Sequence, residues 1–134
     1  VGLGGALVGF DGLSVELVLG CCFRSLAFLL GIHWGETQIA GSLIGQKLVF
    51  NEFVAFVAFT NQMEVLSDHT QAVVTFALCG FANFSSIGIM LGGLGVMAPN
   101  RRSDIAELGL RAVFAGFMAN LMSAAIAGFF ISLT

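Results

Sequence analysis

Hydrophobic residues fill most of the chain in long stretches, with few polar positions between them. The first stretch runs from Gly12 to about Ile32 and the last from Ala112 to about Leu133. Each is long enough to cross a bilayer core, which takes about 20 helical residues. The pattern therefore predicts transmembrane helices near both ends, and residues 1–34 form a unit of one such helix with a short N-terminal loop.

The first predicted helix holds two charged residues, Glu16 and Arg24, about two helical turns apart. An exposed ion pair at membrane depth is costly. We expect Glu16 to lie near one interface and Arg24 to snorkel or to face other protein segments. This helix is therefore not a simple lipid-facing anchor.

Residues 35–67 contain two apolar pieces around a polar centre, Asn51 and Glu52. A helix of about 14 residues reaches only about 21 Å, so neither piece can cross the core alone. Two short arms with a polar tip indicate a re-entrant helical hairpin, which needs protein or a watery cavity around it. The alternative is one continuous helix from Glu36 to about Met63, with Lys47 and Glu52 buried.

Residues 68–99 could form one span, but polar residues and glycines interrupt its middle. Asn83, Ser85 and Ser86 precede a glycine-rich run, and both features loosen a helix. We expect a discontinuous helix, broken near residues 83–87, as found at ligand sites of transporters. The alternative is that Gly88 and Gly92 form a GxxxG packing face while the polar residues only join helices.

Residues 100–134 form the last unit, a polar loop and the final span. Pro99 and Asn100 end the preceding helix, and Ser103 is a plausible N-cap of the next one. Loop 99–111 contains three arginines, which by the positive-inside rule place it in the cytoplasm. The C-terminus is then periplasmic or extracellular, and the small residues of the final span suit close helix packing.

Composition supports an all-α integral membrane protein. Hydrophobic residues make up 57% of the chain and charged residues 10%, against about 25% charged residues in soluble proteins. The net charge is −3 with five basic residues in all, which excludes binding to a nucleic acid polymer. Three cysteines lack the spacing of a metal site, and we interpret them as small apolar residues.

Catalytic motifs are missing, so intramembrane polar groups are the candidates for function. Lys47, Asn51 and Glu52 are expected at the hairpin tip, and Asn83, Ser85 and Ser86 at the helix break. Together such groups could hold a polyhydroxylated solute. The alternatives are a structural membrane subunit, a transporter of another small polar solute, and an intramembrane enzyme using Glu52 with His69.

Two motifs add a family resemblance. Residues 45–56, GQKLVFNEFVAF, resemble the signature of concentrative nucleoside transporters, which reads G/A-x-K-x-x-x-N-E-F-V-A followed by an aromatic residue or Met. Residues 80–88, GFANFSSIG, resemble the second hallmark of that family, and residues 92–105 resemble its bacterial members in particular. The resemblance covers nearly the whole chain and corresponds to the C-terminal part of such a transporter.

The resemblance implies a fold and a binding site. The chain would be the second half of an inverted-repeat transporter: a scaffold helix, a re-entrant hairpin, a discontinuous helix and a final span. Glu52, Asn83 and Ser86 would contact the ribose hydroxyls of a nucleoside, with Phe81 lining the same pocket. No catalytic residue, metal ligand or cofactor is expected in this chain.

The resemblance also implies partners and a location. The function would be symport of nucleosides into the cell, coupled to Na⁺ or H⁺, with the ion site in a first half that this chain does not contain. The protein would be a multi-pass homotrimer in the bacterial inner membrane. This chain, a fragment of a longer one, would supply the ribose-binding half of the site.

Overall fold

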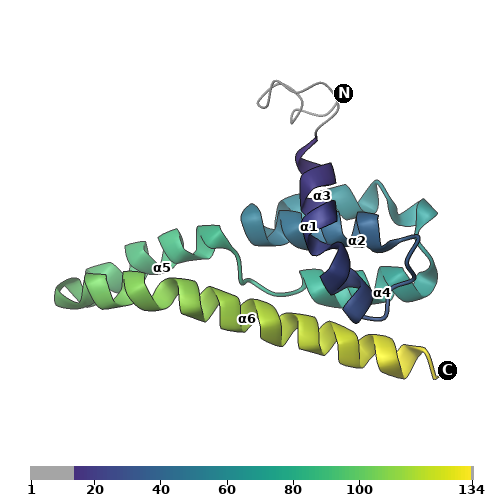
Figure 1. Cartoon of the computed structure of the whole chain (residues 1–134). Coiled ribbons are helices and arrows are strands. Elements are labelled where there is room, and N and C mark those ends of the chain that lie inside the picture. The colour runs from purple at the N-terminus through teal and green to yellow at the C-terminus, as the bar shows by residue number, and fades with distance from the viewer. Residues whose placement is uncertain (1–13, 134) are drawn as a thin grey trace.

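The computed structural model describes residues 14–133, and all regular structure in this range is helical (Figure 1). The prediction of an all-α chain is confirmed for these residues. The expected start of the first span at Gly12 and the short N-terminal loop lie outside them. The helices are α1 (Val15–Leu29), α2 (Thr37–Val49), α3 (Glu52–Thr60), α4 (Asp68–Leu78), α5 (Phe84–Met97) and α6 (Arg102–Ile131), with 3-10 turns η1 (Met63–Val65) and η2 (Pro99–Arg101).

Polar side chains fix where most of these helices begin. Ser14, Asn51, Ser67 and Asn83 each accept a hydrogen bond from a backbone N–H of the first turn, at the start of α1, α3, α4 and α5. Such N-caps satisfy donors that have no partner within the helix. The short polar interruptions of the hydrophobic pattern are therefore mainly helix starts.

Close packing of α1 on α2 depends on glycine. A Cβ added to Gly41 in α2 would lie 2.9 Å from both the Arg24 nitrogen and the Phe23 carbonyl carbon of α1. These neighbours are backbone atoms and cannot move aside as a side chain can. Only a glycine allows the two helix backbones to approach this closely.

Helices α4 and α5 lie end to end along α6, antiparallel to it (Figure 1). An added Cβ would meet Val73 at Gly128, Ala82 at Gly116 and Ile87 at Gly109. In these three contacts the residue number rises from α4 to α5 while that of the α6 partner falls, so α6 runs antiparallel to both. The small residues of α6 thus let one long helix support two short ones, as expected from its composition.

The hydrophobic core lies where α1, α2 and α4 meet the C-terminal half of α6. Its largest buried apolar side chains come from α2, α4 and α6, with one residue after α1: Leu43, Ile44, Val73, Val74, Leu78, Phe117 and Ile32. Arg24 of α1 packs over the Trp34 ring at 4.1 Å and donates to Thr37. Arg24 therefore faces other protein segments, one of the two positions expected for it.

The polar stretch before the final span is helical, which corrects two expectations. Residues 99–111 are not a loop, because η2 leads directly into α6 at Arg102. Ser103 is inside the helix and is not its N-cap, a position that Arg101 holds without a side-chain hydrogen bond. The expected stop before Pro99 is confirmed, since α5 ends at Met97.

The break between α4 and α5 lies earlier than expected. It spans residues 79–83 and not 83–87, because Asn83 caps α5 and the serines after it belong to that helix. The continuous helix from Glu36 to Met63 is excluded, since α2 ends at Val49 and α3 begins at Glu52. Gly88 and Gly92 have no atom within 4 Å of an added Cβ among the described residues, so no GxxxG contact forms there.

Among the described residues, one helical stretch is long and apolar enough to cross a membrane. It runs from Pro99 to Ile131 with a mean hydropathy of 1.8 over its most apolar window. The 30 residues of α6 extend about 45 Å. Its apolar part, residues 112–131, has about the length that the bilayer core requires.

Candidate functional site

The carboxylate of Glu52 and the amide of Asn83 meet between two helix starts. Asn83 Nδ2 donates a hydrogen bond to Glu52 Oε2 at 2.9 Å. Glu52 is the first residue of α3, and Asn83 is the N-cap of α5. The positive ends of two helix dipoles therefore lie beside one carboxylate.

The polar tip between α2 and α3 presents Glu52. Phe50 ends α2 with φ −97° and ψ −90°, and Asn51 is extended. Asn51 Oδ1 accepts from the Val54 N–H at 2.9 Å, which starts α3 at once. Helix α3 therefore begins directly after Asn51, and Glu52 is the residue at its N-terminal end.

Asn83 lies at the centre of a second hydrogen-bond network and is fully buried. Its Oδ1 accepts from the Ser86 N–H at 2.9 Å and from Ser85 Oγ at 2.6 Å. Ser86 Oγ lies within hydrogen-bond distance of both the N–H and the carbonyl oxygen of Asn83, which completes a capping box. Because Oδ1 accepts the hydrogen bond that caps α5, Nδ2 is the atom of the amide that donates to Glu52.

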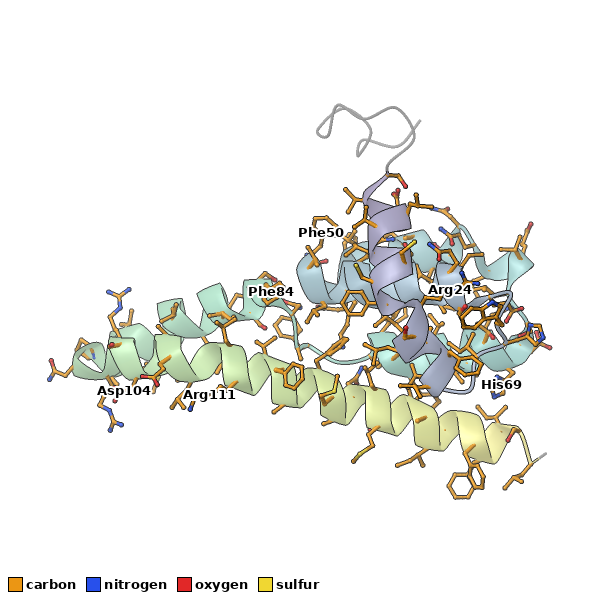
Figure 2. All side chains as sticks on the ribbon, in the orientation of Figure 1. Arg24, Phe50, His69, Phe84, Asp104 and Arg111 are labelled. Atoms are coloured by element: carbon orange, nitrogen blue, oxygen red, sulfur yellow. The ribbon has the colours of Figure 1, made fainter. Side chains whose placement is uncertain are left out.

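Exposed aromatic side chains lie next to the residues of this network in the sequence. The Phe50 and Phe84 side chains are 43% and 48% exposed, and both lie close to the junction between α2 and α5 (Figure 2). Phe53 and Phe81 are still more exposed, at 73% and 62%. The polar network is thus bordered by apolar surface that this chain leaves uncovered.

The four residues expected to contact substrate do not all touch. Glu52, Asn83 and Ser86 form one hydrogen-bonded chain from α3 to α5. Phe81 lies in the linker before α5, two residues from Asn83. Lys47, expected at the hairpin tip, is instead fully buried in the last turn of α2, where it contacts α4.

A polar contact that sequence reasoning missed joins the start of α2 to the start of α4. The Glu36 carboxylate accepts from the Ser67 N–H at 2.8 Å, from Ser67 Oγ at 2.9 Å and from the Thr70 hydroxyl. Partial burial raises the pKa of Glu36, but these hydrogen bonds outweigh it and hold the pKa below its usual 4.5. No local sequence pattern indicates this contact, because its partners are more than 30 residues apart.

Two cavities of the described residues lie away from Glu52. One of about 280 Å³ is lined by the end of α1, His69 and the last turns of α6. Another of about 500 Å³ lies between the end of α5 and the start of α6. We assign the candidate site from its chemistry, since a buried amide and a carboxylate at two helix starts are groups that orient a polar ligand.

Comparison with known proteins identifies the class. A solved structure of CNTnw in an inward-facing substrate-bound state is 50% identical, with a TM-score of 0.89 over 97% of this chain and 32% of that chain. The fold described above is thus that of about a third of the CNTnw chain. Residues 1–128 match the sequence model described as the C-terminus of Na⁺-dependent nucleoside transporters. The chain belongs to this family and corresponds to the C-terminal part of a concentrative nucleoside transporter.

Relatives occur in bacteria and in animals. An uncharacterized transporter of Bacillus subtilis, YutK, is 60% identical over 131 residues, covering 96% of this chain and 32% of the relative. The putative nucleoside permease NupX of Escherichia coli is 49% identical, with the same two coverages. The human sodium/nucleoside cotransporter 1 is 40% identical over 92% of this chain and 21% of its own length. The chain spans about a third of the length of its bacterial relatives.

Proposed function

We propose that the complete protein containing this chain carries nucleosides into the cell by cation-coupled symport. This chain supplies the half of the binding site that holds the ribose. Glu52, Asn83 and Ser86 bind the ribose hydroxyls, and Phe81 lines the same pocket. Transport needs no covalent step, because the substrate leaves chemically intact.

The hydrogen bond between Glu52 and Asn83 supports this role most directly. It leaves Glu52 Oε1 and the remaining lone pairs of Oε2 available, next to two helix N-termini. A ribose offers two vicinal hydroxyl donors, which suit one carboxylate. A nucleoside without these hydroxyls leaves the carboxylate desolvated and unpaired, so it binds more weakly.

The architecture that we propose uses α2 and α3 as a re-entrant hairpin within residues 35–67. Their 13 and 9 residues reach about 20 and 14 Å, too short to cross the bilayer. The bonds from Ser67 to Glu36 bring the end of this unit back to its start. Helices α4 and α5 form a discontinuous helix within residues 68–99, broken at the depth of the site.

Residues 1–34 then supply a scaffold helix, and residues 100–134 the final span. The exposed arginines at the start of α6 support a cytoplasmic position for that end by the positive-inside rule. The C-terminus is then on the periplasmic side of a bacterial inner membrane. The coupling ion binds in the part of the protein outside this chain. Sodium is favoured over protons by the sodium-dependent family and its animal relatives. We expect a homotrimer, as the family resemblance implies.

The test is uptake of labelled uridine by the complete protein in cells that lack their own nucleoside carriers. We expect saturable uptake that falls when sodium is replaced by choline. Uptake that survives in choline but collapses with a proton ionophore would assign proton coupling instead. Absence of uptake for uridine and for every other nucleoside, with the protein present in the membrane, would contradict the proposal.

A further inference from the structure

Lys47 is a fully buried lysine with an unusual set of partners. Its side chain is 0% exposed, and its Nζ donates to the Ala77 carbonyl oxygen at 3.3 Å. The same nitrogen lies 5.3 Å from the centre of the Phe117 ring. The ion pairs of the described residues lie on exposed parts of α6 and its entry. Lys47 is therefore held by a backbone oxygen and an aromatic face in place of a carboxylate.

The oxygen that Lys47 binds belongs to the end of α4. The last four carbonyls of a helix have no partner within it, and the helix dipole makes this end negative. Asn120 of α6 also donates through Nδ2 to the Ala77 carbonyl and, at 3.3 Å, to the Phe76 carbonyl. Two side chains from different helices thus donate to the C-terminal end of α4. The two helices, α2 and α6, both pack against α4 (Figure 1).

Space for this cap is built into the linker after α4. A Cβ added to Gly80 would lie 2.7 Å from Cγ of Asn120. The glycine therefore lets the Asn120 amide reach the helix end. Because water is scarce at membrane depth, carbonyls left without such donors there would be costly.

The two partners of this contact, Lys47 and Ala77, each lie a few residues before one member of the candidate site in the chain. Lys47 is five positions before Glu52, in the last turn of the helix that leads to the turn at Asn51. Ala77 is six positions before Asn83 on the other side of the break. The hydrogen bond between Lys47 and Ala77 therefore fixes the position of α2 relative to α4. That position in turn fixes the geometry of the hydrogen bond between Glu52 and Asn83.

We propose that Lys47 is a positioning residue that, together with Asn120, caps the broken end of α4 and holds Glu52 and Asn83 in register for the ribose. Lys47 does not touch the substrate. It acts as an internal, covalently tethered cation at the negative end of a half-helix. This inference rests on the proposed nucleoside transport, and its test separates the two.

The experiment compares Lys47→Met, Lys47→Arg and Gln46→Met in the complete protein. Gln46 is the matched control, because it is equally part of buried α2 but bonds only to Ser42 within that helix. Uptake is normalised to the amount of protein in the membrane. The KM is measured for uridine and for 2′-deoxyuridine, so that discrimination by the ribose is read apart from expression.

For Lys47→Met we expect the KM for uridine to rise about tenfold, as for loss of one charge-assisted hydrogen bond, and the preference over 2′-deoxyuridine to shrink. Lys47→Arg keeps the charge, and its KM for uridine should stay within about threefold of the wild-type KM. Gln46→Met should have the wild-type KM. Wild-type KM and discrimination in Lys47→Met would overturn the proposal. Equal impairment by Lys47→Met and Lys47→Arg would do the same.

A second variant decides the outcome if Lys47→Met does not reach the membrane. Asn120→Leu removes the other donor to the end of α4 while Lys47 remains. A raised KM for uridine with a weaker preference over 2′-deoxyuridine supports the cap. An unchanged KM and preference overturn it. If the wild type itself moves no nucleoside, the proposed function fails, and hydrogen exchange in the purified complete protein tests the cap alone. Faster exchange in residues 77–83 of Asn120→Leu than of Gln46→Met supports the cap, and equal exchange contradicts it.

Discussion

Asn83 donates to Glu52 across a gap of 31 residues in the chain, and both side chains stand at the start of a helix. The amide can do this because its oxygen is engaged by the α5 backbone, which leaves only the nitrogen to face the carboxylate. One residue thus starts a helix and orients the charge of another. The predictions below follow from this arrangement and from the packing that holds it.

Removal of ribose hydroxyls should weaken competition with labelled uridine. We expect 2′,3′-dideoxyuridine to compete about a hundredfold less well than uridine, because a charged acceptor then loses its partners. Inhibition constants from uptake by the complete protein give the ratio. In Glu52→Gln the ratio should approach one, and a ratio that persists there would assign hydroxyl recognition to other residues.

Asn83→Asp should separate helix capping from site geometry. Aspartate is as good an N-cap as asparagine, so α5 should still form. The new carboxylate faces Glu52, and two like charges at this distance disfavour each other. We expect normal amounts in the membrane with the KM for uridine raised about tenfold or more. Asn83→Ala loses the cap as well and should be about 1 kcal/mol less stable. A wild-type KM in Asn83→Asp would contradict the assigned geometry.

Gly41→Ala should destabilise the protein, since its methyl group meets the backbone of α1 at 2.9 Å. Overpacking of this kind costs about 1 to 3 kcal/mol. The melting temperature of the complete protein in detergent measures the effect. Gly35→Ala is the control, because its added carbon would make only an ordinary contact of 3.6 Å with His33. Equal melting temperatures in the two variants would refute close packing of α1 on α2.

Glu36 should stabilise the protein in a pH-dependent way. Its pKa is held below 4.5 in the folded state, so its contribution is complete above the ordinary pKa and is lost as the pH falls through the folded-state value. We expect Glu36→Gln to lower the melting temperature by a constant amount above about pH 5 and by less below it. Glu64→Gln, a change at an exposed position, should show no such trend. A difference independent of pH would mean that the charge of Glu36 plays no part.

Much of the fold could be predicted because its interruptions are local. The pair Asn51–Glu52 between two short apolar pieces correctly indicated a helix end and a new start. The break near Asn83 was predicted but placed too late. Serines and asparagine were treated as residues that loosen a helix, whereas a capping box uses the same residue types to begin one.

The errors around residues 99–111 have a related cause. The polar stretch predicts a loop, yet α6 is longer than the hydrocarbon core of a bilayer, and its charged first turns stay helical outside the apolar part. The roles of Glu36 and Lys47 could not be predicted at all. Each depends on partners about 30 residues away that only packing brings near.

The most direct test of the ribose assignment is equilibrium binding of uridine to the purified complete protein and to its Glu52→Gln variant. Glu64→Gln serves as the control for a carboxylate lost elsewhere. We predict saturable binding by the wild type and the control, and an affinity lower by about tenfold or more in Glu52→Gln. Equal uridine affinities in all three proteins would contradict the assignment of Glu52 to the nucleoside site.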